Sequence, residues 1–171
     1  YIFDKVENQL YSAADVNPFS INLSARRIND IKVVNGDYWI ASNSGVYQVN
    51  ASGKLKNHLN YESDPLIGTN DIFNILEVDG DIWLGTDNHL SIYSPEQSKF
   101  VSIGPDNAGL TGLTQRYILS SFEDSTGKVW LGSYRGLFNY DPVRNGNRLY
   151  SNEKEFQEKT DGNTIWALDE D

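Results

Sequence analysis

The chain has 171 residues, 39% of them hydrophobic and 12% aromatic, so it can bury a sizeable core and is not composed like a disordered tail. Fourteen basic and 24 acidic residues give a formal net charge of −10, which disfavours binding to nucleic acid or to an anionic membrane surface. The sequence has no cysteine, which excludes disulfides and thiolate sites, and it contains neither a membrane-helix pattern nor a signal-peptide pattern.

The first residues predict part of a repeated unit. Residues 1–4, Tyr-Ile-Phe-Asp, align with residues 138–141, Phe-Asn-Tyr-Asp, which read as the third strand of a four-stranded unit. The first two strands of that unit would precede the chain. The sequence also lacks methionine, so we expect Tyr1 to be an internal residue, with any targeting or membrane segment outside this piece.

Three of the four tryptophans reveal the repeat. Trp39, Trp83 and Trp130 stand in matching segments, Tyr-Trp-Ile-Ala-Ser, Ile-Trp-Leu-Gly-Thr and Val-Trp-Leu-Gly-Ser, at spacings of 44 and 47 residues. A period of about 40 to 50 residues is typical of the four-stranded blades of a β-propeller. A tight turn precedes each tryptophan and contains Gly36, Gly80 or Gly127; Asn-Gly and Asp-Gly pairs favour type I′ hairpins.

Four strands are expected in each repeat. The first strands are predicted at 28–34, 72–78 and 118–122, and the tryptophan strands follow the turns. The third strands are predicted at 46–49, 90–93 and 137–140, and the fourth at 55–59, 99–103 and 148–150. Residues 164–171 align with 117–124 and are expected to form the first strand of a further unit, whereas the polar stretch 152–161 reads as a loop.

The tryptophan strands are apolar on both faces, so each sheet must be covered on both sides. Radially stacked blades achieve this without helices. We therefore predict an all-β chain, a β-propeller segment of about 3.7 four-stranded antiparallel blades belonging to a larger propeller. The predicted division is the end of a blade at 1–25, blades at 26–70, 71–116 and 117–163, and the first strand of the next blade at 164–171.

The third repeat resembles the two-component regulator propeller repeat. Residues 123–142 match that motif almost throughout, with an acidic pair, Gly127, the Trp-Leu-Gly-Ser segment, Gly136-Leu137 and the closing Tyr-Asp-Pro. The other repeats are looser, since Ala41 replaces the small glycine and His89 stands where the neighbouring repeats have glycine. The resemblance implies a periplasmic sensor region of a bacterial hybrid histidine kinase or a related receptor, without catalytic residues. It also implies that a carbohydrate-type or other small molecule is the ligand.

Positions at which the repeats disagree are the candidate binding residues, because function concentrates on loops held by a rigid scaffold. The loops after the tryptophan strands differ most, and the residues at the entry to the first strands come next. The candidates for ligand or partner contact are Asn43, Asp87, His89, Tyr134, Arg135, Arg27 and Arg116.

Several patterns have a structural explanation that we prefer. His58 and His89 occupy different repeat positions, so we expect no metal site and no cofactor, and we expect His89 to adopt a positive φ. The acidic pairs at 79–81 and 123–124 fall in turns and are interpreted as turn residues rather than calcium ligands or catalytic acids. The repeated tryptophans are interpreted as core packing rather than sugar-stacking surfaces.

Three functions remain open from the sequence. The leading hypothesis is a non-catalytic sensing module of an extracytoplasmic receptor; the alternatives are part of a propeller enzyme acting on carbohydrates, such as a glycosidase or lyase, and a structural spacer. Because end sheets of an open array leave an apolar face uncovered, we also expect the chain to self-associate through its end blades or to be marginally soluble.

Overall fold

The computed structural model describes residues 2–4, 9–11, 27–101, 117–134, 136–141, 146–149 and 164–170. Within these ranges the protein is all-β, with three four-stranded antiparallel sheets and one two-stranded hairpin. The helical structure in the same ranges is a single 3₁₀ turn, η1 (Pro65–Ile67). No helix in this part of the chain is long and apolar enough to span a membrane.

Each sheet is formed by strands that follow one another in the chain. The first sheet contains β3 (Ile28–Val34), β4 (Asp37–Ser42), β5 (Gly45–Val49) and β6 (Leu55–Leu59). The second contains β7 (Ile72–Val78), β8 (Asp81–Thr86), β9 (Leu90–Ser94) and β10 (Lys99–Val101). The third contains β11 (Ile118–Glu123), β12 (Val129–Ser133), β13 (Gly136–Asp141) and β14 (Gly146–Leu149), and β1 (Ile2–Asp4) pairs with β2 (Gln9–Tyr11).

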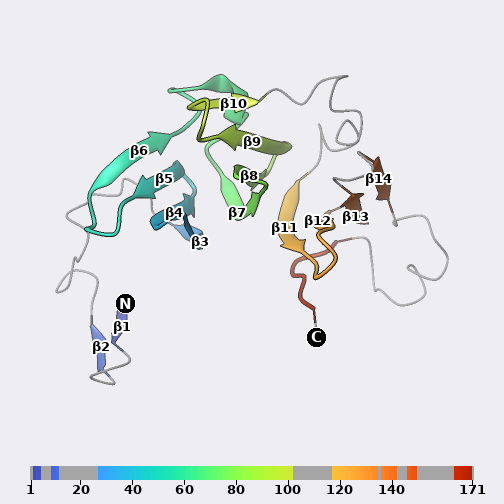
Figure 1. Cartoon of the computed structure of the whole chain (residues 1–171), viewed down its shortest axis with the longest axis horizontal. Coiled ribbons are helices and arrows are strands. Elements are labelled where there is room, and N and C mark those ends of the chain that lie inside the picture. Colours follow the sequence, from blue (N-terminus) through green and yellow to red (C-terminus); the bar gives the residue numbers. More distant parts are fainter. Residues whose placement is uncertain are drawn as a thin grey trace.

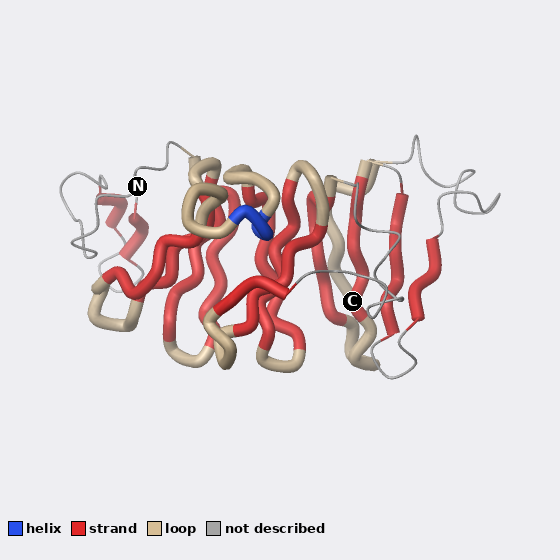
Figure 2. The backbone as a smooth tube through the Cα atoms, turned by 90° about the horizontal axis from the view of Figure 1, so that it is seen from above, coloured by secondary structure: helices blue, strands red, loops and turns tan. Residues whose placement is uncertain are grey.

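The three sheets stand side by side in an arc. The first strands β3, β7 and β11 lie on its concave side, and β6, β10 and β14 lie on its convex side (Figure 1). β7 contacts both β3 and β11, so the second sheet packs between the other two. The strands run between two edges of the arc, and η1 lies at one of them (Figure 2).

The predicted hairpin turns are confirmed. Asn35 and Gly36 have φ of 52° and 80°, and Asp79 and Gly80 have φ of 51° and 87°, the positive pair that a type I′ turn requires. This backbone twist matches that of the strands it joins. The turns therefore fix the register in which each tryptophan strand pairs with the strand before it, with Val34 opposite Asp37 and Val78 opposite Asp81.

The hydrophobic core lies between the sheets. Trp39 on the first sheet contacts Tyr93 on the second at a ring-centroid distance of 5.8 Å, and Trp83 on the second contacts Tyr140 on the third at 5.5 Å. Both tryptophans are buried, with 2% and 5% of their surface exposed. Core packing, as expected from the sequence, is therefore the role of these two side chains.

Trp130 agrees only in part with the expectation that all three repeated tryptophans pack in the core. It occupies the same register position as Trp39 and Trp83, opposite the first and third strands of its own sheet, but it is only half-buried. A complete sheet covers each of the other two tryptophans. Among the described residues, the third sheet is followed by the segment 164–170, which covers less of the indole ring.

Two residues after the tryptophan, the second and third sheets have a glycine. At this glycine the backbone of the next repeat approaches the sheet closely. A Cβ on Gly85 would lie 2.6 Å from the Ile118 carbonyl oxygen, and a Cβ on Gly132 would lie 2.8 Å from the Ile165 carbonyl oxygen. Ile165 thus occupies the place against the third sheet that Ile118 occupies against the second. Gly85 and Gly132 thus leave room for the backbone that begins the following repeat and runs directly over them.

Other boundaries differ from those expected. Residues 164–170 contact the third sheet but form no strand, because no strand lies beside them in the described structure to complete a ladder. β14 begins at Gly146, two residues before the predicted start at Arg148, and the predicted ends of the last two fourth strands, at 103 and 150, lie outside the described residues. The loop expected at 152–161 lies outside the described residues, and the division into blades remains a prediction.

Candidate functional site at the loop edge

One edge of the arc carries most of the residues selected from the sequence. We call it the loop edge: it contains the residues that enter the first strands, the turns between the second and third strands, and the connection at 60–71. The turns between the second and third strands at this edge are built alike. Ser42, Thr86 and Ser133 each end a tryptophan strand, and each side-chain hydroxyl donates to the carbonyl oxygen of the residue three positions later, at 2.7, 2.6 and 2.9 Å. The hydroxyl of the repeat motif therefore holds this turn.

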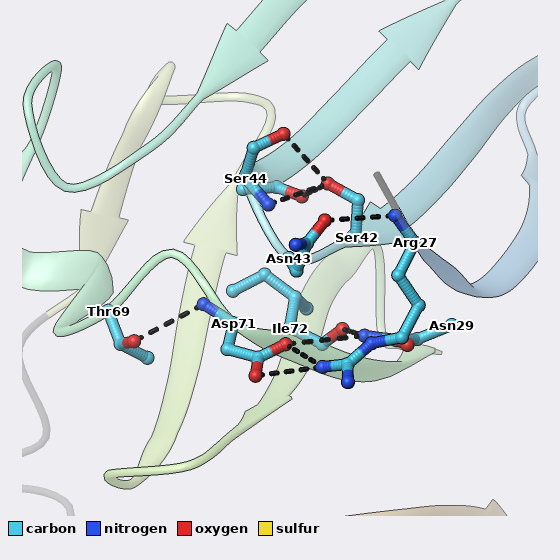
Figure 3. A network of polar contacts seen from close by, with 9 residues as sticks. Arg27, Asn29, Ser42, Asn43, Ser44, Thr69, Asp71 and Ile72 are labelled. Atoms are coloured by element: carbon cyan, nitrogen blue, oxygen red, sulfur yellow. Dashed lines mark hydrogen bonds and ion pairs between the residues drawn. The ribbon is translucent and has the colours of Figure 1, made fainter. Parts of the chain in front are cut away.

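Arg27 and Asn43 come together at the first sheet. The Arg27 backbone N–H donates to the Asn43 side-chain oxygen at 3.0 Å, and the Asn43 backbone N–H donates to the Arg27 carbonyl at 3.2 Å (Figure 3). The Arg27 guanidinium donates to both carboxylate oxygens of Asp71, at 2.7 and 2.9 Å. Asn29 completes the network by donating to the Ile72 carbonyl at 2.6 Å.

This network ties the first sheet to the second. Arg27 precedes β3 and Asn29 is its second residue. Asp71 precedes β7 and Ile72 is its first residue. The side chains of Arg27 and Asp71 are 55% and 33% exposed, so solvent screens the ion pair and it adds at most about 1 kcal/mol. Asp71 was not selected from the sequence. The feature that would have revealed it is its position, because Arg27, Asp71 and Tyr117 each stand directly before a first strand.

Asp87 and His89 lie in the corresponding turn of the second sheet. The ring of His89 packs against Gly68 of the η1 connection, and its Nε2 lies 3.2 Å from the Ser91 hydroxyl. Burial lowers the pKa of His89, and this outweighs the opposing effects of the Leu66 backbone and Asp87. The expected positive φ at His89 is wrong, since the non-glycine residues with positive φ in the described structure are Asn35, Asp79 and Ser98. One carboxylate oxygen of Asp87 is buried without a hydrogen-bond partner.

Tyr134 meets two aromatic residues that the sequence analysis did not select. Its ring lies 5.0 Å from Tyr117 and 5.6 Å from Trp166, both in edge-to-face geometry. Tyr117 precedes β11, Tyr134 lies in the turn after β12, and Trp166 lies in the segment 164–170. Arg116 and Arg135, which adjoin Tyr117 and Tyr134 in the sequence, lie outside the described residues, so their predicted role stays a prediction.

The histidines and acidic turns have structural contacts. The His58 ring stacks on Tyr47 with centroids 4.0 Å apart, and its Nε2 lies 2.7 Å from the Ser44 carbonyl oxygen. Asp124 accepts hydrogen bonds from Thr126, Lys128 and the Trp130 indole, and the Thr126 and Trp130 bonds lead the causes that hold the pKa of its carboxyl well below the usual range. Within the described ranges, no three His, Asp or Glu side chains cluster in a way that could hold a metal ion.

The known proteins to which this chain is similar include signalling proteins. No protein-family model matches the sequence. A curated relative, histidine kinase P4 of Formosa agariphila, is 29% identical over 115 residues, which cover 64% of this chain and 8% of the relative.

Solved structures share the fold. The extracellular domain described as a one-component system of B. thetaiotaomicron aligns with 89% of this chain at 18% identity and a TM-score of 0.67, and this chain covers 20% of it. The extracellular domain of a hybrid two-component system of the same organism aligns with 74% of this chain at 18% identity and a TM-score of 0.59, and this chain covers 17% of it. The chain therefore spans about a fifth of the solved chains that it matches.

The resemblance drawn from the sequence is thus confirmed. The chain shares the fold of extracellular domains that are described as parts of one-component and hybrid two-component systems.

Proposed function

We propose that this chain is a non-catalytic sensing segment of a bacterial extracytoplasmic signalling receptor. The observation that carries the proposal is the fold shared with a receptor extracellular domain over 89% of the chain. The weaker sequence match to a histidine kinase supports the same class of protein independently of the fold. The acidic residues that could suggest catalysis are in turns, where Asp124 already accepts hydrogen bonds from its own hairpin.

We further propose that the three sheets are blades of a larger propeller, with the division 1–25, 26–70, 71–116, 117–163 and 164–171. The register of the terminal hairpin supports the first boundary. Asp4 pairs with Gln9, Ser94 with Lys99 and Asp141 with Gly146, so β1 and β2 join with the same spacing as the third and fourth strands of the second and third sheets. The last boundary is supported by Ile165, whose backbone N–H donates to the Ser133 carbonyl at 3.0 Å.

The ligand of this segment, in our proposal, is a small carbohydrate-type molecule bound at the loop edge. Asn43 and Arg27 already bond to each other and to Asp71, so they would contribute to such a site chiefly by shaping it. Tyr134 keeps 43% of its surface exposed and is the better placed of the predicted residues for direct contact.

Location can be tested with an introduced cysteine, because this chain has none of its own, and the unsubstituted receptor labelled in parallel accounts for thiols elsewhere. In the full-length receptor, Lys99→Cys places a thiol at an exposed position of β10, whereas Ile82→Cys places one at a fully buried position. A membrane-impermeant maleimide should label Lys99→Cys in intact cells and Ile82→Cys only after denaturation. Labelling of Lys99→Cys that requires cell lysis would contradict an extracytoplasmic location.

A second experiment distinguishes a sensing segment from an enzyme and from a structural spacer. The purified chain is incubated with a panel of oligosaccharides, and both retention on the immobilised sugars and the release of shortened products are measured. A sensing segment retains sugars and leaves them intact. Shortened products would establish the enzyme, and a receptor whose signalling survives replacement of the loop-edge turns would establish the spacer.

A further inference from the structure

Three aromatic side chains form an exposed group at the loop edge of the third sheet. Tyr117, Tyr134 and Trp166, which we call the aromatic cluster, are 47%, 43% and 66% exposed. The Tyr117 and Tyr134 rings meet at 73°, and the Tyr134 and Trp166 rings at 83°. Residues far apart in the sequence are thus brought by the fold into one nearly perpendicular arrangement of rings.

The internal repeat shows that this surface is specific to the third sheet. Tyr117 and Tyr134 occupy the positions of Arg27 and Asn43 in the first sheet. There the two residues bond to each other, and Arg27 bonds across to Asp71, so polar contacts close the junction between sheets. In the third sheet, aromatic faces open to solvent stand in place of those contacts.

Trp166 should stay partly exposed even if a further sheet packs after the segment 164–170. Ile165 sits over Gly132 as Ile118 sits over Gly85, which makes Trp166 the counterpart of Leu119 and of Phe73. Phe73 is only half-buried although the third sheet packs beside its own. A further sheet after the segment 164–170 should therefore leave the Trp166 ring partly open.

We propose that the aromatic cluster is the surface on which a pyranose ring of the ligand stacks, an inference that rests on the proposed sensing function. Tyrosine and tryptophan offer an apolar ring face together with a polar hydroxyl or N–H at its edge, which suits a ring with C–H groups on its face and hydroxyls on its rim. Both side chains have few rotatable bonds, so binding costs little conformational entropy. Two rings at a right angle contact such a ligand from two sides.

The test is retention of the purified chain on an array of neutral and acidic oligosaccharides, followed by titration of the retained sugars with tryptophan fluorescence. Trp166→Ala and Tyr134→Ala should weaken binding by about tenfold or more, which is what the loss of one stacking contact of roughly 1.4 kcal/mol gives. Leu55→Ala removes an apolar side chain that is 40% exposed at the start of β6, away from the loop edge, and it should bind as the parent does.

Each other outcome is informative. Sugar binding that is unchanged in Trp166→Ala and Tyr134→Ala would agree with the sensing function but would show that the aromatic cluster is not the binding site. If no sugar is retained while the impermeant reagent still labels Lys99→Cys, the ligand is not a pyranose, and the proposed extracytoplasmic location is unaffected. Retention of methylated ammonium compounds instead of sugars, or protection of Trp166 from acrylamide quenching in the longer receptor, would also overturn the inference.

Discussion

At the scale of single residues, Trp83 is the side chain on which the packing of two sheets depends. It is 5% exposed and contacts Tyr140 of the following sheet. We expect Trp83→Ala to lower the free energy of unfolding by about 3 to 5 kcal/mol, the range for deleting a large core aromatic residue. Trp166→Ala, at a site 66% exposed, should change it by about 0.5 kcal/mol at most. Urea denaturation of both variants measures the contrast, and equal losses would contradict the assignment of Trp83 to the core.

His89 makes stability depend on pH. Burial lowers its pKa from the ordinary value of 6.5, so the folded state favours the neutral ring while the unfolded chain takes up a proton below about pH 6.5. The unfolded state then binds more protons, and stability should fall as the pH drops from about 7 toward about 5. We expect His89→Gln to lose this part of the pH dependence in urea midpoints measured across that window.

His58→Gln is the matched control, because His58 is a half-buried histidine that contacts the Ser44 carbonyl. That variant should keep the decline in stability of the parent chain. An unchanged decline in His89→Gln, or its disappearance in His58→Gln, would assign the effect to a different group.

At the scale of elements, the sequence predicted strands better than contacts between strands. The bounds of β3 and β7 agree with the prediction because each strand ends at a two-residue turn whose Asn-Gly or Asp-Gly pair accepts positive φ. Among the outer strands, β6 has the predicted bounds, whereas β14 begins at Gly146 rather than at Arg148. Weak alternation in such strands leaves their ends undetermined by the sequence.

The candidate site was predictable to the extent that it is local. Asn43 and Tyr134 stand out because corresponding turns differ, and this comparison needs only the repeat. Asp71 and Trp166 are partners from the next repeat, 44 residues from Arg27 and 32 residues from Tyr134. Alignment of repeats compares positions within a unit, so it does not show which residues of neighbouring units touch.

The junction between sheets gives a prediction at this scale. A Cβ on Gly85 would clash with the Ile118 carbonyl oxygen and with the Asn74 side chain, whereas Ala41 shows that the first junction accommodates a methyl group. We expect Gly85→Ala to cost about 1 to 3 kcal/mol through overpacking, and Ala41→Gly to cost about 1 kcal/mol. Chemical denaturation of the two variants is the measurement, and a Gly85→Ala variant as stable as its parent would show that the sheets are less closely packed than described.

At the scale of the whole molecule, the first sheet presents an uncovered apolar face. Ile28 and Ile31 are 42% and 55% exposed, whereas Ile72 and Ile75, their counterparts in the second sheet, are 0% and 1% exposed because the first sheet covers them. The third sheet in turn has a groove of about 340 Å³, lined in part by Phe122, Leu137 and Leu168. Two different apolar surfaces at opposite ends of the arc permit a head-to-tail association of copies.

We therefore expect the isolated chain to self-associate through these end surfaces or to be only marginally soluble, because apolar patches of this kind mark interfaces or aggregation sites. Light scattering over a dilution series should show a mass that rises with concentration. Ile31→Glu should shift the chain toward monomer, since a buried carboxylate at such an interface is costly. Leu66→Glu, at a site 51% exposed on η1 at the loop edge, should leave the association unchanged. A parent chain that stays monomeric at every concentration and unfolds cooperatively would show that the end faces need no partner.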